Sequence, residues 1–299
     1  MSNRKIALLS ACGGLLCIYI IQLVFALRSP VKNISLAGDF DTILINNGSN
    51  SVTLSKTDDG WVIGEKKYAA NESTTDGMVN ALKTVNVLNT VGKTGNEAVE
   101  ERYELTGSKA VTVTASKKGK TLRTLKIGKA SSTGSQSYVT IDGGKDICLV
   151  SGNLHDTFGK TADDIRSKIV YKADKDQLSE IAETVNGVTL TVAKSGSPAA
   201  WSAAGGTPAV DSEKAGSWAE SLYSVSANSW LDDSFVLPEK PESVTVITAG
   251  TKKITLTIYK TGKDDDVKYY GTCSETPYKF ELSSYAAGKY MKKAEELQK

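Results

Sequence analysis

Residues able to do chemistry are few in this sequence, and the nearest approach to a known motif is a phosphate-binding loop. Such a loop needs two glycines separated by four residues and followed by Lys-Ser/Thr, so that backbone N–H groups surround a phosphate. Here Gly152 and Gly159 stand before Lys160-Thr161 with six residues between the glycines, and Gly119-Lys120-Thr121 lacks the first glycine. We therefore expect no nucleotide site, and we interpret Gly119 as part of a hairpin turn.

The remaining titratable groups also lack partners at useful spacing. His155, the one histidine, lies beside Asp156, but no nucleophile accompanies it, so general-base catalysis is not indicated. Asp264-Asp265-Asp266 has the carboxylates that Ca²⁺ prefers but not the glycine and glutamate of a calcium loop, and Asp174-Lys175-Asp176 fails for the same reason. We expect no catalytic, cofactor-binding or metal-binding residue, and we interpret the aspartate run as a solvated loop tip.

Composition excludes one further class of partner. The chain has 36 basic and 34 acidic residues, mixed along its length, for a net charge of +2. A nucleic-acid-binding protein needs a basic face to neutralise phosphates, and none is evident. With 299 residues and 40 % hydrophobic content, the chain is long enough for two domains with a core in each.

The amino terminus carries the strongest signal of location. Arg4 and Lys5 precede an uncharged run of 22 residues, Ile6 to Leu27, which Arg28 closes. As a helix this run would span ~33 Å, enough to cross a bilayer core. Because positive residues favour the cytoplasmic side, we predict a cytoplasmic tip at residues 1–5, a single transmembrane anchor at residues 6–27 and an extracytoplasmic remainder.

Two alternatives to a retained anchor stay open. Val24-Phe25-Ala26 offers the small residues that signal peptidase requires, which would allow cleavage after Ala26, although the run is longer than a usual cleaved signal. Leu9-Ser10-Ala11-Cys12 resembles a lipobox, in which Cys12 would be lipidated. In the exported part only Cys148 and Cys273 remain, and we interpret them as free and buried rather than as a disulfide.

The exported part repeats itself. Residues 60–85 and 200–225 match at an offset of 140, and the following segments match at an offset near 131. The matched pairs are Trp61/Trp201, Asn71/Asp211, Met78/Trp218, Leu82/Leu222, Val85/Val225, Ile127/Ile258, Tyr138/Tyr269 and Leu149/Phe280. A period this long indicates a duplicated domain rather than a solenoid.

Each half shows the same predicted order of elements. Two strands and a turn come first, then an amphipathic helix opened by Ser73 or Thr74 in one half and by Asp211 or Ser212 in the other, then four strands of alternating pattern. The segment from Leu154 and the segment from Ser283 read as further helices, and Ile169 to Tyr171 reads as a strand. We predict an α+β fold of two tandem pseudo-repeats, residues 28–170 and 171–299, each an antiparallel sheet covered by one or two helices.

The order of three stretches resembles a known family. They are YELTGSKAVTVTA from Tyr103, LKIGKASSTGSQSYVTIDGGKDICLV from Leu125 and DDIRSKIVYKADKDQLSEIAETVNG from Asp163, and together they resemble the bacterial domain of unknown function 4340. Glu104 and Ser108-Lys109 depart from the family pattern at a turn. The resemblance implies a membrane-anchored extracytoplasmic protein found beside ABC transporters of the gliding-motility auxiliary type, and it implies no established activity.

The expected function follows from the anchor, the repeat and the resemblance. We expect a non-catalytic accessory protein of the bacterial cell envelope that binds protein partners in an ABC-type membrane complex. An alternative is a module that binds envelope glycan or peptidoglycan through the aromatics Trp230, Tyr269 and Tyr270, whereas Trp61 and Trp201 are interpreted as packing positions. A hydrolase with a carboxylate pair assembled across the halves is the least favoured alternative.

Overall fold

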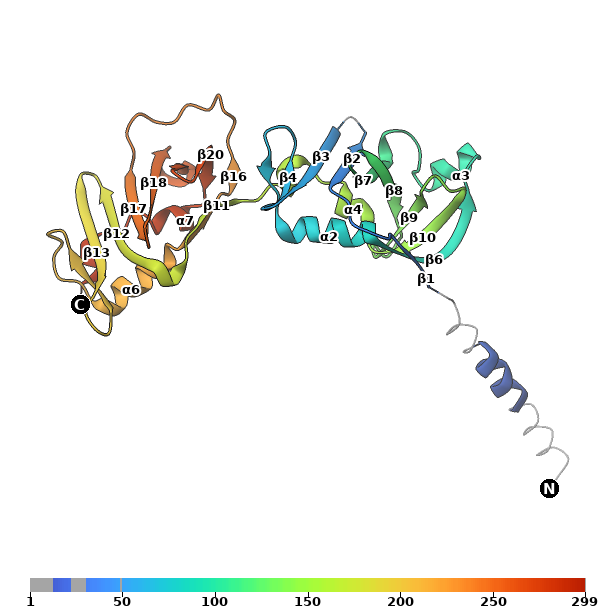
Figure 1. Cartoon of the computed structure of the whole chain (residues 1–299), viewed down its shortest axis with the longest axis horizontal. Coiled ribbons are helices and arrows are strands. Elements are labelled where there is room, and N and C mark those ends of the chain that lie inside the picture. Colours follow the sequence, from blue (N-terminus) through green and yellow to red (C-terminus); the bar gives the residue numbers. More distant parts are fainter. Residues whose placement is uncertain (1–12, 23–30, 49, 299) are drawn as a thin grey trace, which may run out of the picture. The chain divides into compact units, whose positions relative to one another are not determined.

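The computed structural model describes residues 13–22, 31–48 and 50–298. Among these residues strands predominate, with 46 % of positions in strands and 23 % in helices. The predicted α+β class is therefore wrong, and the described chain is mostly β with large antiparallel sheets. Within it the chain divides into two compact units at Ser167/Lys168, whereas the expected boundary was 170/171 (Figure 1).

The first unit is built on one ten-stranded antiparallel sheet, in the order β1-β6-β10-β9-β8-β7-β2-β3-β4-β5. Its strands are β1 (Lys32–Ser35), β2 (Thr42–Asn47), β3 (Asn50–Thr57), β4 (Gly60–Ile63), β5 (Tyr68–Ala69), β6 (Thr84–Lys93), β7 (Val111–Lys117), β8 (Lys120–Ala130), β9 (Gln136–Ile141) and β10 (Asp146–Ser151). Its helices are α2 (Glu72–Lys83), α3 (Glu97–Arg102), α4 (Leu154–Phe158) and α5 (Ala162–Ile165), with a 3-10 turn η1 (Gly107–Lys109). Helices α2 and α4 contact each other and pack on the sheet, and Met78 and Leu82 of α2 enter the core.

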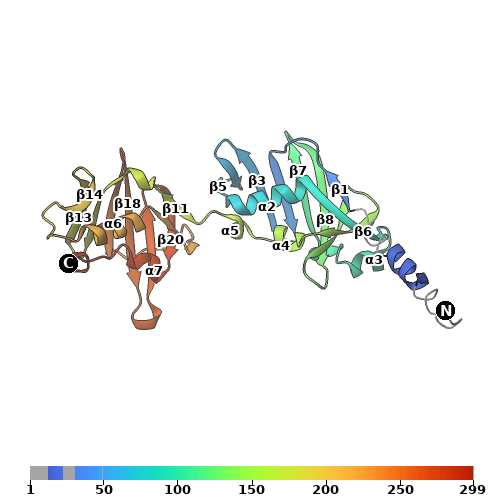
Figure 2. The same cartoon turned by 90° about the horizontal axis from the view of Figure 1, so that it is seen from below.

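The second unit holds an eight-stranded sheet, in the order β14-β13-β12-β17-β18-β19-β20-β16, and a separate pair β11-β15. Its strands are β11 (Ile169–Lys172), β12 (Leu178–Val185), β13 (Val188–Ser195), β14 (Ala200–Ala204), β15 (Ser224–Ser226), β16 (Ser229–Trp230), β17 (Ser243–Ala249), β18 (Lys252–Thr261), β19 (Lys268–Cys273) and β20 (Thr276–Leu282). Its helices are α6 (Ser212–Ser221) and α7 (Ser284–Gly288), with 3-10 turns η2 (Lys175–Gln177), η3 (Asp264–Asp266) and η4 (Ala294–Leu297). Figure 2 shows α6 and α7 with the strands of this unit.

The two sheets follow one chain path. Without β1 and β5, the first sheet reads β6-β10-β9-β8-β7-β2-β3-β4, and the second reads β16-β20-β19-β18-β17-β12-β13-β14. Details of hydrogen bonding also recur: the Asn71 N–H donates to the carbonyl of Ile165 at 2.7 Å, and the Asp211 N–H donates to the carbonyl of Leu297 at 2.7 Å. Each unit thus ties the start of its long helix to its own last segment.

Turn residues explain several of the hairpins. Lys118 and Gly119 have φ of 49° and 78° between β7 and β8, and Asn186 and Gly187 have φ of 50° and 81° between β12 and β13. Positive φ at both central residues is the geometry of the tight hairpin turns that match strand twist. The prediction of a hairpin turn at Gly119 is confirmed.

The predicted register of the repeat is correct in the helix and wrong by one residue in the last two strands. Val111 pairs with Ile127, which pairs with Val139, whereas Ser243 pairs with Ile258, which pairs with Gly271. Val139 therefore corresponds to Gly271 at an offset of 132, not 131. Because successive side chains of a strand point to opposite faces, this shift matches Cys148, not Leu149, with Phe280.

The helices are shorter than the sequence indicated. The segment from Leu154 forms only α4 and α5, of 5 and 4 residues, and the segment from Ser283 forms only α7 and η4. The cap of α2 is Asn71, whose side chain accepts from the Thr74 N–H, so the expected caps Ser73 and Thr74 are wrong. The expected cap Asp211 is confirmed, as is a strand from Ile169.

The predicted transmembrane helix is not found in the described chain. Residues 13–22 are helical, but no helix among the described residues combines the length and the apolar character needed to cross a membrane. The predicted tip at residues 1–5, and residues 6–12 and 23–27 of the predicted anchor, lie outside the described residues.

Candidate functional site

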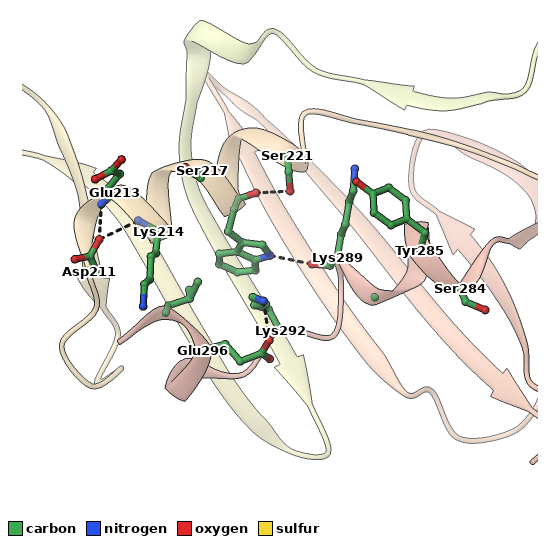
Figure 3. A pocket seen from close by; sticks show the side chains of 13 residues that line it. Asp211, Glu213, Lys214, Ser217, Ser221, Ser284, Tyr285, Lys289, Lys292 and Glu296 are labelled. Carbon is green, nitrogen blue, oxygen red and sulfur yellow. Dashed lines mark hydrogen bonds and ion pairs between the residues drawn. The ribbon is translucent and has the colours of Figure 1, made fainter. Parts of the chain in front are cut away.

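A concave site lies on the second unit, between α6 and the carboxyl-terminal segment. It is a groove of about 900 Å³, which we call the α6 groove (Figure 3). One wall is α6, and the other is formed by α7 and by residues 289–298, which we call the strap. Residues of the groove are Asp211, Glu213, Lys214, Ser217, Trp218, Ser221, Ser284, Tyr285, Gly288, Lys289, Lys292, Glu296 and Leu297.

Trp218 fixes the floor of the groove. Its side chain is 6 % exposed, and its indole N–H donates to the carbonyl of Lys289 at 2.8 Å. The Ser221 hydroxyl donates to the Trp218 carbonyl at 2.7 Å. A buried tryptophan with a satisfied N–H makes a rigid apolar floor, because its polar atom is already bound.

The walls carry charges of both signs. Lys292 Nζ lies 2.6 Å from Glu296 Oε2, and this hydrogen bond, together with the Lys293 N–H, lowers the pKa of Glu296. Lys214 Nζ donates to the carbonyl of Gln298 at 2.7 Å, which joins α6 to the strap. Asp211 Oδ1 accepts the N–H groups of Glu213 and Lys214 at 3.0 Å and so caps α6.

The two ends of the groove differ in charge. At one end the carboxylates of Asp211 and Glu213 stand at the start of α6 (Figure 3). At the other end the Tyr285 side chain is 79 % exposed, and Lys289 Nζ lies 4.9 Å from the centre of its ring. The α6 groove therefore has two carboxylates at one end, together with the Lys214 ammonium that binds the Gln298 carbonyl, and a cation beside an aromatic ring at the other end.

A buried carboxyl lies behind the strap. Glu183 of β12 is fully buried, its Oε1 accepts a short hydrogen bond from the Lys292 N–H, and the Thr245 hydroxyl lies 3.5 Å from its Oε2. Burial away from water raises the pKa of Glu183 to about 8, and the two hydrogen bonds only partly oppose this. Near neutral pH this carboxyl is therefore protonated.

Two buried tyrosines continue this polar interior. The hydroxyls of Tyr171 and Tyr290 lie 2.7 Å apart, and Tyr171 donates to the carbonyl of Leu222 at 2.6 Å. Burial raises the pKa of both phenols. The Ser243 hydroxyl is also buried and has no protein partner within the described residues.

The first unit has a smaller groove that corresponds to one end of the α6 groove. It measures about 520 Å³ and lies between the end of α2 and residues 151–157, lined by Asn80, Lys83, Leu154 and Thr157 among others. One apolar residue that lines this groove is Leu154, which matches Ala286 of the second unit at an offset of 132. The wider and more charged groove belongs to the second unit.

One family matches the middle of the chain. Residues 61–243 match the family described as Domain of unknown function (DUF4340), which is more than half of the chain. The chain belongs to this family. A search of the curated proteins and a search of the solved structures found no match to the chain. The match to the DUF4340 family spans the end of the first unit and the start of the second, and it names no activity.

The structure does not bring the chemical candidates of the sequence together. His155 and Lys160-Thr161 lie on or after the short helix α4, and Asp264 and Asp266 lie in the 3-10 turn η3 with both side chains exposed. In the described part of this DUF4340 chain, no three His, Cys, Asp or Glu side chains are placed to hold a metal ion. Cys148 and Cys273 are free and buried, one in each unit.

The three aromatics of the glycan alternative do not share a surface. Trp230 and Tyr269 pack against the core of the second unit, and Trp230 meets Phe280 edge-on at 6.0 Å. Tyr270 follows Tyr269 in the strand and so points to the opposite face, where its ring lies 4.8 Å from that of Phe235. Trp201 is buried, and Trp61 packs at the edge of the first core.

The sequence reasoning missed the residues that make the groove. Glu183, Tyr285 and the strap were not singled out, although Trp218 and Asp211 entered as repeat positions. The sequence does contain a signal for Glu183. Strands β2 and β12 match at an offset of 138, and at that offset the charged Glu183 stands where the first unit has the apolar Ile45. The offset of 140 that matches the two helices does not align these two residues.

Proposed function

We propose that the protein is a non-catalytic accessory protein that acts outside the cytoplasm at the membrane and holds a partner protein of an ABC-type transporter complex. The observation that carries the proposal is the α6 groove, whose floor is fixed and whose ends differ in charge. The DUF4340 family membership supports the transporter setting through the resemblance described above. The apolar run from Ile6 to Leu27 supports the membrane location.

The chemistry of the groove favours a polypeptide segment as its occupant. Lys289 with Tyr285 offers a cation beside an exposed aromatic ring, and Asp211 with Glu213 offers carboxylates at the far end. A loop of a partner protein can present an acidic side chain to the first end and a basic one to the second, with apolar atoms over Trp218. Complementary charge of this kind sets orientation and rejects wrong partners.

A co-purification from membranes in mild detergent tests the proposal. The chain should recover subunits of an ABC transporter, identified by mass spectrometry. Lys289→Glu should lower that recovery at least ~10-fold, because it places a carboxylate against the acidic side chain expected of the partner. The matched control is Lys83→Glu, a charge reversal at the groove of the first unit. Lys83 makes only an exposed ion pair with Asp39, so its folding cost is small.

Two results would count against the proposal. Recovery that Lys289→Glu and Lys83→Glu reduce equally would show that the α6 groove is not the contact. Recovery of no transporter subunit by the unchanged chain would remove the partner class.

A further inference from the structure

The strap is held to the second unit by contacts of several kinds. The Lys289 carbonyl accepts from Trp218, Tyr290 bonds Tyr171, and the Leu297 carbonyl accepts from the Asp211 N–H. Tyr290 and Leu297 are both buried. The Lys292 N–H of the strap also donates to Glu183, a titratable side chain of the eight-stranded sheet.

We propose that closure of the strap requires Glu183 to carry its proton, so that ionisation of this single carboxyl releases the strap and dismantles the α6 groove. The strap supplies one wall of that groove through Lys289, Lys292 and Glu296. That opening of the strap also releases a bound partner rests on the proposed function. That ionisation of Glu183 opens the strap does not rest on it.

Within the described chain two hydrogen-bond donors reach Glu183, the Lys292 N–H and the Thr245 hydroxyl, and they do not outweigh its burial. Across the sheet β13 places Leu190 opposite it and β17 places Thr245. Helix α6, which packs on β12, turns Ala215, Trp218 and Ala219 to the core.

The strap itself faces Glu183 with three titratable groups. Tyr290 adds a buried phenol, and Glu296 adds a like charge that disfavours ionisation. Lys292 adds a cation that favours ionisation, but its Nζ is already paired with Glu296 at 2.6 Å. A charge formed on Glu183 is therefore poorly compensated while the strap is closed, and opening it admits water.

The energetic link has a definite sign. With the strap closed the carboxyl titrates near pH 8, and in an open, hydrated state it would titrate near its ordinary 4.5. Between these values the opening equilibrium constant rises about tenfold for each pH unit, and above pH 8 it stays level. Acid therefore favours the closed strap.

Hydrogen exchange of the 299-residue chain, without any partner, tests the coupling. The protection factors of amides in residues 289–298 should fall about tenfold for each pH unit from pH 5 to pH 8 and then stay level. Amides of β17 and β18 in the same unit should keep higher protection than the strap throughout. Glu183→Gln, whose amide can keep the Lys292 hydrogen bond but cannot ionise, should abolish the pH dependence.

Tyr290→Phe provides the matched control, since it puts the residue of the first unit, Phe158, into the strap and removes the bond to Tyr171. It should lower strap protection at every pH and leave the slope unchanged. A pH-independent strap in the unchanged chain would overturn the proposal, even if Glu183→Gln failed to fold. Equal protection factors in the strap and in β17 at every pH would also overturn it, because the strap would then open only when the whole unit unfolds.

Discussion

In the first unit Ile45 faces Val113 across the sheet, whereas in the second unit Glu183 faces Thr245 at the same place. Positions around this pair also differ in polarity between the two units. The residue of the first unit is apolar and that of the second is polar or titratable in the pairs Val111 and Ser243, Ile34 and Tyr171, Phe158 and Tyr290, and Ile141 and Cys273. At these positions the first unit has an apolar interior and the second unit has a polar one.

The shared features explain how one chain path tolerates both interiors. In each unit the residue after β9 or β19 accepts from the backbone of the neighbouring strand: Asp142 from the Thr124 N–H at 2.8 Å, and Ser274 from the Thr255 N–H at 3.0 Å. The helix caps and the helix-to-end hydrogen bonds also recur. Backbone hydrogen bonds and turns thus set the path, and the core residues are free to specialise.

The largest expected effect is the pH dependence of the free energy of unfolding of the second unit. Below pH 4.5 Glu183 is protonated in both the folded and the unfolded chain, and as pH rises the unfolded chain ionises first, because the folded pKa is about 8. The free energy of unfolding should therefore fall between pH 4.5 and 8, by on the order of 3 to 5 kcal/mol, and level off above. Glu183→Gln should remove this fall.

Tryptophan fluorescence during urea unfolding at each pH measures this free energy of unfolding. Trp201, Trp218 and Trp230 lie in the second unit and Trp61 in the first, so a Trp61→Phe background reports on the second unit alone. A free energy of unfolding that rises from pH 5 to 8 would contradict the assignment of Glu183 as a buried acid.

The next prediction exchanges a core pair between the units. In the first unit Val139 pairs with Cys148, two residues of medium size. In the second unit the corresponding pair is a small residue and a large one, Gly271 and Phe280. A Cβ on Gly271 would lie 2.4 Å from the Phe280 ring. Phe280→Cys should cost about 3 to 5 kcal/mol through a cavity and Gly271→Val about 1 to 3 kcal/mol through overpacking.

The double variant Gly271→Val/Phe280→Cys should recover part of that loss, because it restores the pair of the first unit. Urea titration of all three variants gives the coupling energy. Additive costs would show that the two pairs are not equivalent.

A smaller effect is expected at the buried cation of the first unit. Arg123 donates to the carbonyls of Ile34 and Leu82 at 3.4 Å and forms an ion pair with Asp142 at 3.2 Å, whereas the second unit has Ile254 at this place. Arg123→Ile should cost about 1 to 3 kcal/mol, since it leaves acceptors without a donor. The fluorescence of Trp61, the tryptophan of the first unit, reports this cost in a urea titration.

The smallest predicted effect compares the two helix caps. Asp211 accepts two N–H groups and Asn71 accepts one. Each change to Ala should cost about 0.5 to 2 kcal/mol, with Asp211→Ala the larger. Thermal unfolding followed by circular dichroism measures both, and a larger cost for Asn71→Ala would contradict the comparison.

The sequence predicted the repeat positions best where apolar residues recur. Leu82 and Leu222, at the ends of the two long helices, and Val85 and Val225, in the strands that follow those helices, are buried in both units. The mostly β class was missed, since segments such as Thr84–Lys93 join the sheet through pairing with distant strands, and local pattern does not encode such pairing. The contact between Glu183 and the strap was missed because the two are more than a hundred residues apart in the chain.

Site-specific photo-cross-linking tests most directly the claim that the second unit is the binding unit. A photoreactive phenylalanine derivative replaces Tyr285, which is exposed at the α6 groove, and in a separate variant it replaces the exposed Asn80 at the groove of the first unit. The account predicts an adduct with a subunit of an ABC transporter from position 285 and none from position 80. The same adduct from both positions, or from position 80 alone, would contradict it.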